Sequence, residues 1–88
     1  MSYEADAKIF KALADENRLR IMDMLVESGK CASDLLDMLE LSQPTLSHHM
    51  RILWEAGLVN KVKDGRWIRY AISDSGIARI EEIVKRYK

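Results

Sequence analysis

One short stretch of the sequence, LSQPTLSHHM at residues 41–50, gathers several side chains that form hydrogen bonds. An amide side chain can pair with adenine, and hydroxyl groups can donate to base edges or to phosphates. Imidazole rings are common metal ligands. The candidate residues are Gln43, Thr45, Ser47, His48 and His49. Their types point to a nucleic-acid contact surface, with a metal site at the two histidines as the alternative.

The metal alternative for His48 and His49 fails on their spacing if both lie on a helix. Neighbouring residues on a helix point about 100° apart, because a turn takes about 3.6 residues. Two helical ligands of one ion need i, i+3 or i, i+4 spacing. We therefore keep His48 with the polar contact residues and assign a structural role to His49, which lies nearer the apolar side.

This polar stretch is predicted to lie on a helix that runs from about residue 43 to residue 55. Ser42 is a good N-cap, and Pro44 suits the first turn, where its missing N–H costs nothing. The apolar face consists of Leu46, Met50 and Leu53, and Gly57 closes the helix. The polar residues, with Arg51, lie mainly off this face near the N-terminal end, where a recognition helix meets base edges and phosphates.

Other helices are predicted on both sides of this one. Apolar residues at i, i+3 and i+4 spacing indicate them. Their ranges are about 5–14, 16–27 and 32–39, and a last helix opens at Asp74 or Ser75.

From Leu58 the apolar period changes to two, which predicts a β-hairpin of residues 58–63 and 66–72. Asp64 and Gly65 are the expected turn. Two short helices joined by a tight turn and followed by a hairpin form a winged helix-turn-helix. The predicted fold class is therefore mainly α (α+β), with five helices and one β-hairpin wing, in a single domain of residues 1–88.

The net charge is zero, but the charges are unevenly placed. Residues 1–42 hold five Lys or Arg against nine Asp or Glu, whereas residues 43–70 hold five against two. The distribution of charge over a protein steers a charged partner more than the net charge does. The basic middle includes Lys63 and Arg66 on the hairpin, which we expect to contact double-stranded DNA.

The chain has 88 residues and one cysteine, so no disulfide within the chain can add stability. A chain of this size buries only about 60–65% of its unfolded surface. The start, MSYEADAKIF, carries charges where a signal peptide needs an apolar run, and the lone cysteine fits a reducing cytoplasm. We expect a homodimer through the first and last helices. The candidate interface residues are Ile9, Ile77, Ile80, Ile83, Val84 and Tyr87, unless some of them pack within the monomer.

Three segments, FKALADENRLRIMDML, LSQPTLSHHMRILWEAGLV and KDGRWIRYAI, resemble the ArsR/SmtB family of metal-responsive repressors. The resemblance covers about residues 8–73. It implies a homodimer that binds an imperfect inverted repeat in a promoter and leaves the DNA when an inducer binds. The matched positions imply DNA contacts at Gln43, Thr45, Ser47 and His48, with Lys63 and Arg66 on the wing.

The segment KCASDLL departs from one family pattern, which has two cysteines one residue apart. Cys31 matches the first cysteine, but the second is Ser33, and a hydroxyl is a poor ligand for a soft ion. Residues 74–88 hold no His or Cys, so the family's second metal pattern is absent. Cys31 is an inert small residue, a partial ligand with Asp34, or a reactive thiol at a helix start. A thiophilic metal or metalloid ion is the candidate inducer.

Glu40 lies in the tight turn before the polar helix, where the family usually has Gly or Asn. Glu tolerates positive φ poorly, so the turn is either strained by about 1 kcal/mol or differently shaped. Asp34, Asp37 and Glu40 are interpreted as a solvated acidic face beside the DNA-contact surface.

Two other function classes compete with DNA binding. A winged helix that binds proteins would expose large apolar residues; Trp67 favours it, whereas Arg51, Lys63 and Arg66 disfavour it. An enzyme would need a phosphate loop, a nucleophile with its base, or a metal cluster, and the sequence has none of these patterns. The predicted function is therefore a DNA-binding repressor and not an enzyme.

Overall fold

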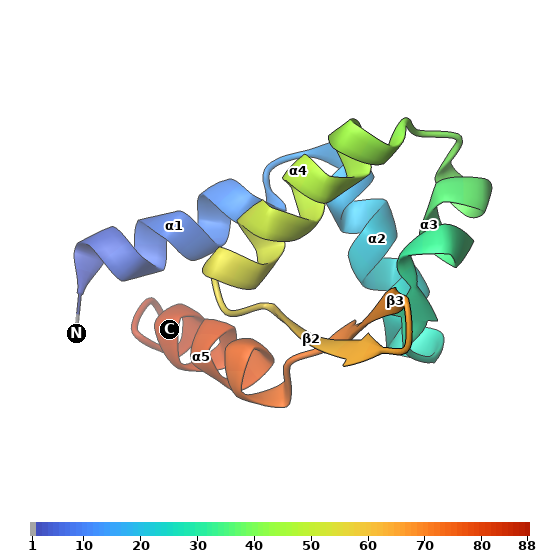
Figure 1. Cartoon of the computed structure of the whole chain (residues 1–88). Helices are drawn as coiled ribbons and strands as arrows, with labels where there is room; N and C mark the ends of the chain where they lie inside the picture. The colour runs from blue at the N-terminus through green and yellow to red at the C-terminus, as the bar shows by residue number, and fades with distance from the viewer. Residues whose placement is uncertain (1) are drawn as a thin grey trace.

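The computed structural model describes residues 2–88, as five helices and three strands (Figure 1). In chain order they are α1 (Tyr3–Leu13), α2 (Glu16–Glu27), β1 (Lys30–Cys31), α3 (Ala32–Leu39), α4 (Gln43–Glu55), β2 (Val59–Asp64), β3 (Trp67–Ile72) and α5 (Asp74–Lys85). The five helices and the β2–β3 hairpin confirm the predicted winged helix-turn-helix. None of the helices in residues 2–88 combines the length and apolar character needed to cross a membrane.

The helices begin where side chains cap their free N–H groups. Asp15 accepts a hydrogen bond from the Arg18 amide at the start of α2, and Ser42 accepts one from the Thr45 amide at the start of α4. The cap at Ser42 confirms the prediction from residue type, and Asp15 is of a type that favours the same position. The last helix begins at Asp74, the first of the two predicted positions, and Ser73 caps it by accepting from the Gly76 amide.

Two forms were predicted for the turn between α3 and α4, one strained at Glu40 and one differently shaped. The structure has the strained form. Glu40 has φ 54° and ψ 38°, in the left-handed region, and its N–H donates to Leu36 O at 3.0 Å. A residue with a Cβ holds this conformation at a cost of about 1 kcal/mol. The turn thereby sets α3 and α4 as the two helices of a helix-turn-helix.

The hairpin forms in a register one residue away from the predicted one. Asp64 pairs with Trp67, so the turn residues are Gly65 and Arg66 rather than Asp64 and Gly65. Gly65 has φ +63° whereas Arg66 has negative φ, which is the pattern of a turn with glycine at its first central position. Arg66 therefore lies at the tip of the wing and not in the strand, where it was predicted.

The sheet has a third strand that the sequence did not predict. The strand order is β1-β3-β2, and β1 pairs Lys30 with Tyr70 and Cys31 with Arg69. A strand of two residues is too short for a periodic pattern, which explains why it was missed. This strand ties the start of α3 to the base of the wing.

The core draws on all five helices and on the base of the hairpin. On α4 the buried residues include Leu46, Met50 and Leu53, as predicted. The apolar periodicity of α2 also predicts Leu19 and Val26 inside, but they are 49% and 73% exposed. Within residues 2–88 much of each of these two side chains is therefore open to solvent.

One close approach depends on glycine. A Cβ at Gly76 in the first turn of α5 would lie 2.1 Å from the carbonyl oxygen of Gly57. That distance is far below van der Waals contact, so a larger residue would push α5 away from the chain that follows α4.

Candidate nucleic-acid interface

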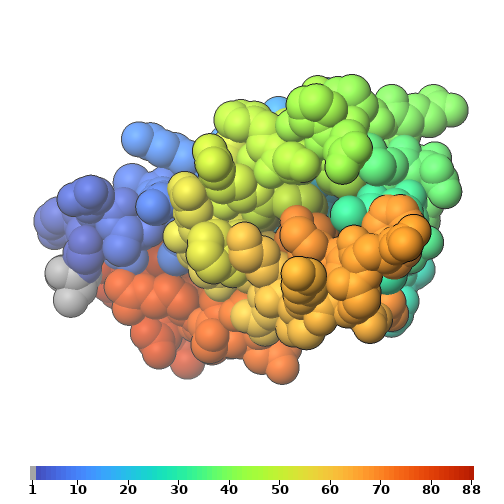
Figure 2. Space-filling view, in the orientation of Figure 1, coloured from blue at the N-terminus to red at the C-terminus, as the bar shows by residue number. Residues whose placement is uncertain are grey.

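The outer face of α4 carries the polar residues selected from the sequence. All of them are exposed, and the opposite face of the helix is buried in the core. They are Gln43, Thr45, Ser47, His48 and Arg51. Figure 2 shows that the surface of α4 and the hairpin adjoin on the same face of the molecule.

A hollow of about 380 Å³ lies between α3, α4 and the wing. Gln43 and Ser47 line it from α4, and Arg66 lines it from the tip of the wing. The structure therefore brings together three of the predicted DNA contacts, although Arg66 lies far from the other two in the sequence. Asp37 of α3 lines the same hollow, so one carboxylate of the acidic face turns toward the interface.

Thr45 and Arg51 have partners on their own helix. The Ser42 hydroxyl donates to Thr45 Oγ1 at 2.8 Å, which orients the threonine at the helix start. Arg51 Nε lies 3.9 Å from Glu55 Oε1, but the Arg51 side chain is 75% exposed. An exposed pair at this distance contributes little, so Arg51 can exchange Glu55 for a phosphate.

The wing adds positive charge beside α4. Lys63 and Arg66 are exposed and line a shallow hollow with Lys61 and Trp67. Lys61 Nζ lies 3.9 Å from the centre of the Trp54 ring, a cation–π contact that joins the wing to the end of α4. Trp54 is not among the contact residues predicted from the sequence, although its helical spacing from Arg51 places it on the same exposed side.

His49 is buried, as its structural assignment requires. Arg18 Nη1 lies 3.1 Å from His49 Nδ1, and Asp15 Oδ2 lies 3.9 Å from the same atom. Burial lowers the pKa of His49, and Asp15 opposes that shift only in part. His48 points away to solvent, so the two rings do not share a ligand position.

Cys31 lies at the start of α3 beside a cation. Arg69 Nη1 donates to Cys31 Sγ at 3.3 Å, while Asp34 Oδ2 accepts from the Cys31 amide at 3.2 Å. Asp34 is thereby held by the backbone, and the Cys31 sulfur already accepts from a guanidinium. In residues 2–88 no three His, Cys, Asp or Glu side chains gather as a metal site. The donor set of one chain does not fit a thiophilic ion.

Comparison with known proteins assigns the family. Residues 15–61 match the family model described as bacterial regulatory protein, arsR family. An uncharacterized HTH-type transcriptional regulator of Methanocaldococcus jannaschii, MJ1325, is 45% identical over 84 residues, covering 94% of this chain and 91% of the relative. The chain belongs to the ArsR family.

Two further comparisons agree with this ArsR-family assignment. An arsenical resistance operon repressor of Staphylococcus aureus is 44% identical over 87 residues, covering 94% of this chain and 84% of that protein. The structure of an ArsR-like transcriptional regulator from Rhodococcus sp. RHA1 superposes with a TM-score of 0.87 at 32% identity, covering 99% of this chain and 83% of that one. The ArsR-family protein is therefore a DNA-binding transcription regulator, and its family is not one of enzymes.

The predicted interface residues of this ArsR-family protein divide between core and surface. Ile9 and Ile83 are 5% and 2% exposed, so they pack within the single chain, which was the alternative left open. Ile77 and Ile80 are partly buried against the core. Val84 and Tyr87 are exposed at the end of the chain. A second copy can therefore reach only Ile77, Ile80, Val84 and Tyr87.

Proposed function

We propose that the protein is a transcriptional repressor that binds a promoter inverted repeat as a homodimer and leaves it when an inducer binds. The observation that carries the proposal is the hollow shared by Gln43, Ser47 and Arg66. Two side chains suited to base edges and one suited to phosphate line the same surface there, as a recognition helix and its wing require.

In this proposal α4 enters the major groove, which is about 12 Å wide and accepts a helix. Gln43, Ser47 and His48 face base edges near the helix N-terminus, where the helix dipole also favours a phosphate. Thr45 supports the helix start through Ser42. The cations Arg51, Lys63 and Arg66 bind the backbone on either side.

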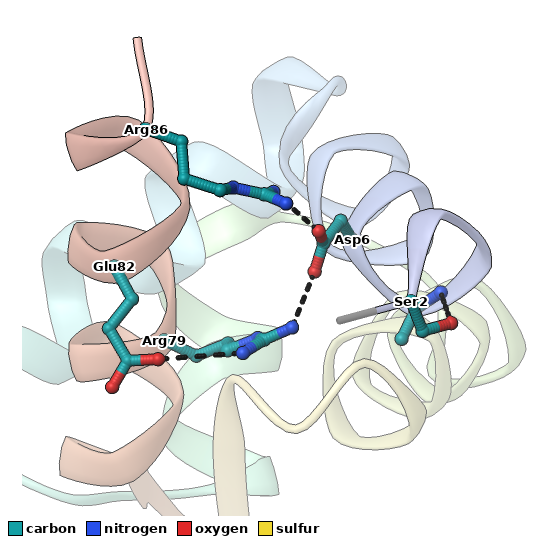
Figure 3. A network of polar contacts seen from close by, with 6 residues as sticks. Ser2, Asp6, Arg79, Glu82 and Arg86 are labelled. Atoms are coloured by element: carbon teal, nitrogen blue, oxygen red, sulfur yellow. Dashed lines mark hydrogen bonds and ion pairs between the residues drawn. The ribbon is translucent and has the colours of Figure 1, made fainter. Parts of the chain in front are cut away.

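The homodimer is proposed to form along α1 and α5. Asp6 of α1 is bound by Arg79 of α5 and by Arg86 at the C-cap of α5, which joins the two helices (Figure 3). The apolar row available to a second copy consists of the partly buried Ile77 and Ile80, the exposed Val84, and the exposed Tyr87 just after α5. Asp74 lies in the first turn of α5 and Lys85 in the last. Antiparallel pairing with a second copy would place these opposite charges together, as a two-fold interface permits.

For the inducer we do not propose a site of three thiolates, and its chemistry is left open. A relative of this chain is named as an arsenical resistance operon repressor. With one cysteine in each chain, a dimer has only two thiols, and each Cys31 is bound by Arg69 in the structure. We therefore derive no release step through a bound metal ion.

A second candidate function is a winged helix that binds another protein. Val62 and Trp67 on the wing are 64% and 50% exposed, which favours an apolar partner. The cations that surround these residues favour DNA.

Fluorescence anisotropy on a duplex from upstream of the protein's own gene tests the proposal. A scrambled duplex of the same length measures non-specific binding, and arsenite, cadmium, zinc and a mild oxidant are added separately as candidate inducers. Specific binding supports the repressor, and an agent that releases the DNA identifies the inducer class. Equal affinity for both duplexes would overturn the proposal in favour of protein binding.

A further inference from the structure

One arginine at the start of α2 joins three helices. Arg18 Nε donates to Ala12 O at 2.7 Å and Arg18 Nη2 donates to Lys11 O at 3.3 Å. Both carbonyls lie in the last turn of α1, where Lys11 O also accepts from the Ala14 amide at 3.2 Å. The remaining Arg18 nitrogen, Nη1, lies 3.1 Å from His49 Nδ1 of α4. In Figure 1, α4 crosses the connection between α1 and α2 at this place.

The geometry decides which way the Arg18–His49 hydrogen bond runs. A guanidinium can only donate, so His49 Nδ1 must accept. When neutral, the ring therefore carries its proton on Nε2. His49 is buried, so the bond is shielded from water and its direction is well defined.

We propose that Arg18 is a positioning residue for DNA binding. Through His49 it fixes the rotation of α4, the proposed recognition helix, and it ties α4 to the end of α1. The inference rests on the proposed function of α4. It assigns a role in DNA reading to a residue that lies on neither α4 nor the wing.

The reason lies in the difference between apolar and polar anchors. Leu46, Met50 and Leu53 hold α4 on the core, but dispersion and the hydrophobic effect have little directional preference. A hydrogen bond weakens steeply when it bends. His48 and Ser47 are helical neighbours of His49, so a fixed His49 ring also fixes the directions in which those two side chains leave the helix.

Protonation of His49 would remove this anchor. A proton on Nδ1 takes away the acceptor and sets a positive ring against Arg18. The charged or titratable neighbours that act on the ring are Asp15 and Arg18 at the start of α2 and His48 on α4. From α1 the contact is made by the Lys11 and Ala12 carbonyls that Arg18 holds. Arg18 and His48 oppose a charged ring and Asp15 favours it.

The experiment compares specificity, the ratio of affinities for the upstream and scrambled duplexes, among four variants and the wild type. Arg18→Met keeps the length of the side chain but removes its donors. Arg20→Met is the matched control, since Arg20 is an exposed arginine of the same helix whose hydrogen bond is to Asn17. Leu25→Val controls for a general loss of stability. Leu25 lines a hollow to which α4 contributes no residue. His49→Asn keeps an acceptor near the Nδ1 position but cannot titrate.

Arg18→Met is expected to lower specificity roughly tenfold, the effect of one charge-assisted hydrogen bond. Arg20→Met and Leu25→Val should keep wild-type specificity at a temperature where all are folded. Wild-type specificity should also fall in acid, at a pH below the ordinary histidine pKa of about 6.5, because burial lowers the pKa of His49. His49→Asn should flatten that fall, because this variant loses the titration of His49.

The outcomes separate this inference from the proposed function. If the wild type does not distinguish the duplexes, the proposed function fails. If it distinguishes them and Arg18→Met does so equally well, Arg18 does not position α4. A specificity loss in Leu25→Val as large as that in Arg18→Met, or a pH profile that His49→Asn leaves unchanged, would reduce Arg18 to a general structural role and overturn the inference.

Discussion

Asp6 of α1 accepts a hydrogen bond of 2.6 Å from Arg86, the C-cap residue of α5, which lies near the other end of the chain. The second carboxylate oxygen accepts one of 2.9 Å from Arg79, two helical turns before Arg86. Asp6 is 5% exposed, so the pair of arginines holds a buried carboxylate between the first and last helices (Figure 3).

Asp6→Asn is expected to lower the melting temperature at neutral pH, because it leaves two arginines without their anion. Burial acts to raise the pKa of Asp6, but the hydrogen bonds from Arg86 and Arg79 outweigh it, and the pKa is lowered. A lowered pKa means that the contribution is complete above the unfolded value of about 3.9 and is lost as the pH falls through the folded value. Thermal melts of both proteins from neutral to acidic pH should therefore converge below about pH 4. A difference that persists undiminished in acid would exclude ionisation of Asp6 as its source.

Ser47→Ala and His48→Ala are each expected to weaken binding to the upstream duplex by about 1 kcal/mol, roughly fivefold. Both side chains are exposed, so the melting temperature should stay within error of the wild type. Titration by fluorescence anisotropy measures the affinity and calorimetry the stability. Wild-type affinity in both variants would remove the outer face of α4 from the DNA contacts.

Arg66→Ala should weaken binding to all duplexes alike and lower the slope of log affinity against log salt by about 1. The cause is the loss of one cation at the wing tip, where it can neutralise one phosphate. Arg20→Ala, which removes an exposed arginine from α2, is the matched control and should keep the slope. An unchanged slope in Arg66→Ala would place the wing tip away from the backbone.

Asp37→Asn is expected to tighten binding to any duplex by about threefold at low salt, because a carboxylate beside Gln43 and Arg66 repels phosphate. Asp23→Asn on the exposed side of α2 makes the same change of charge elsewhere and serves as its control. Anisotropy at two salt concentrations should show that the gain shrinks as salt rises. A loss of affinity would instead mean that Asp37 accepts a hydrogen bond from the DNA.

Val84→Asp should shift the protein toward the monomer, since it places a charge in the apolar row of α5. Val84 is 43% exposed in the single chain, so the fold itself should survive the substitution. Val62→Asp changes an exposed valine on the wing and should leave the oligomeric state unchanged. Sedimentation velocity measures both. Dimers of Val84→Asp with wild-type affinity would move the interface away from this part of α5.

Local sequence decided most of the helices and strands, and also the α4 side of the candidate nucleic-acid interface. Ser42, the apolar spacing of Leu46, Met50 and Leu53, and the change of period at Leu58 each act over a few residues, so α4 and the hairpin could be predicted. The exposed polar face of α4 followed from the same spacing. These features depend on local capping and on period, which a single sequence displays.

Contacts between distant segments were decided by the tertiary structure alone. The pairing of Cys31 with Arg69, the contact of Arg18 with His49, and the turn at Gly65 and Arg66 depend on how elements dock and on strand register. The same holds for the burial of Ile9 and Ile83, because a periodic apolar face does not say whether its own chain or a second copy covers it. Period and residue type specify which side of an element is apolar, whereas only packing in three dimensions specifies what that side meets.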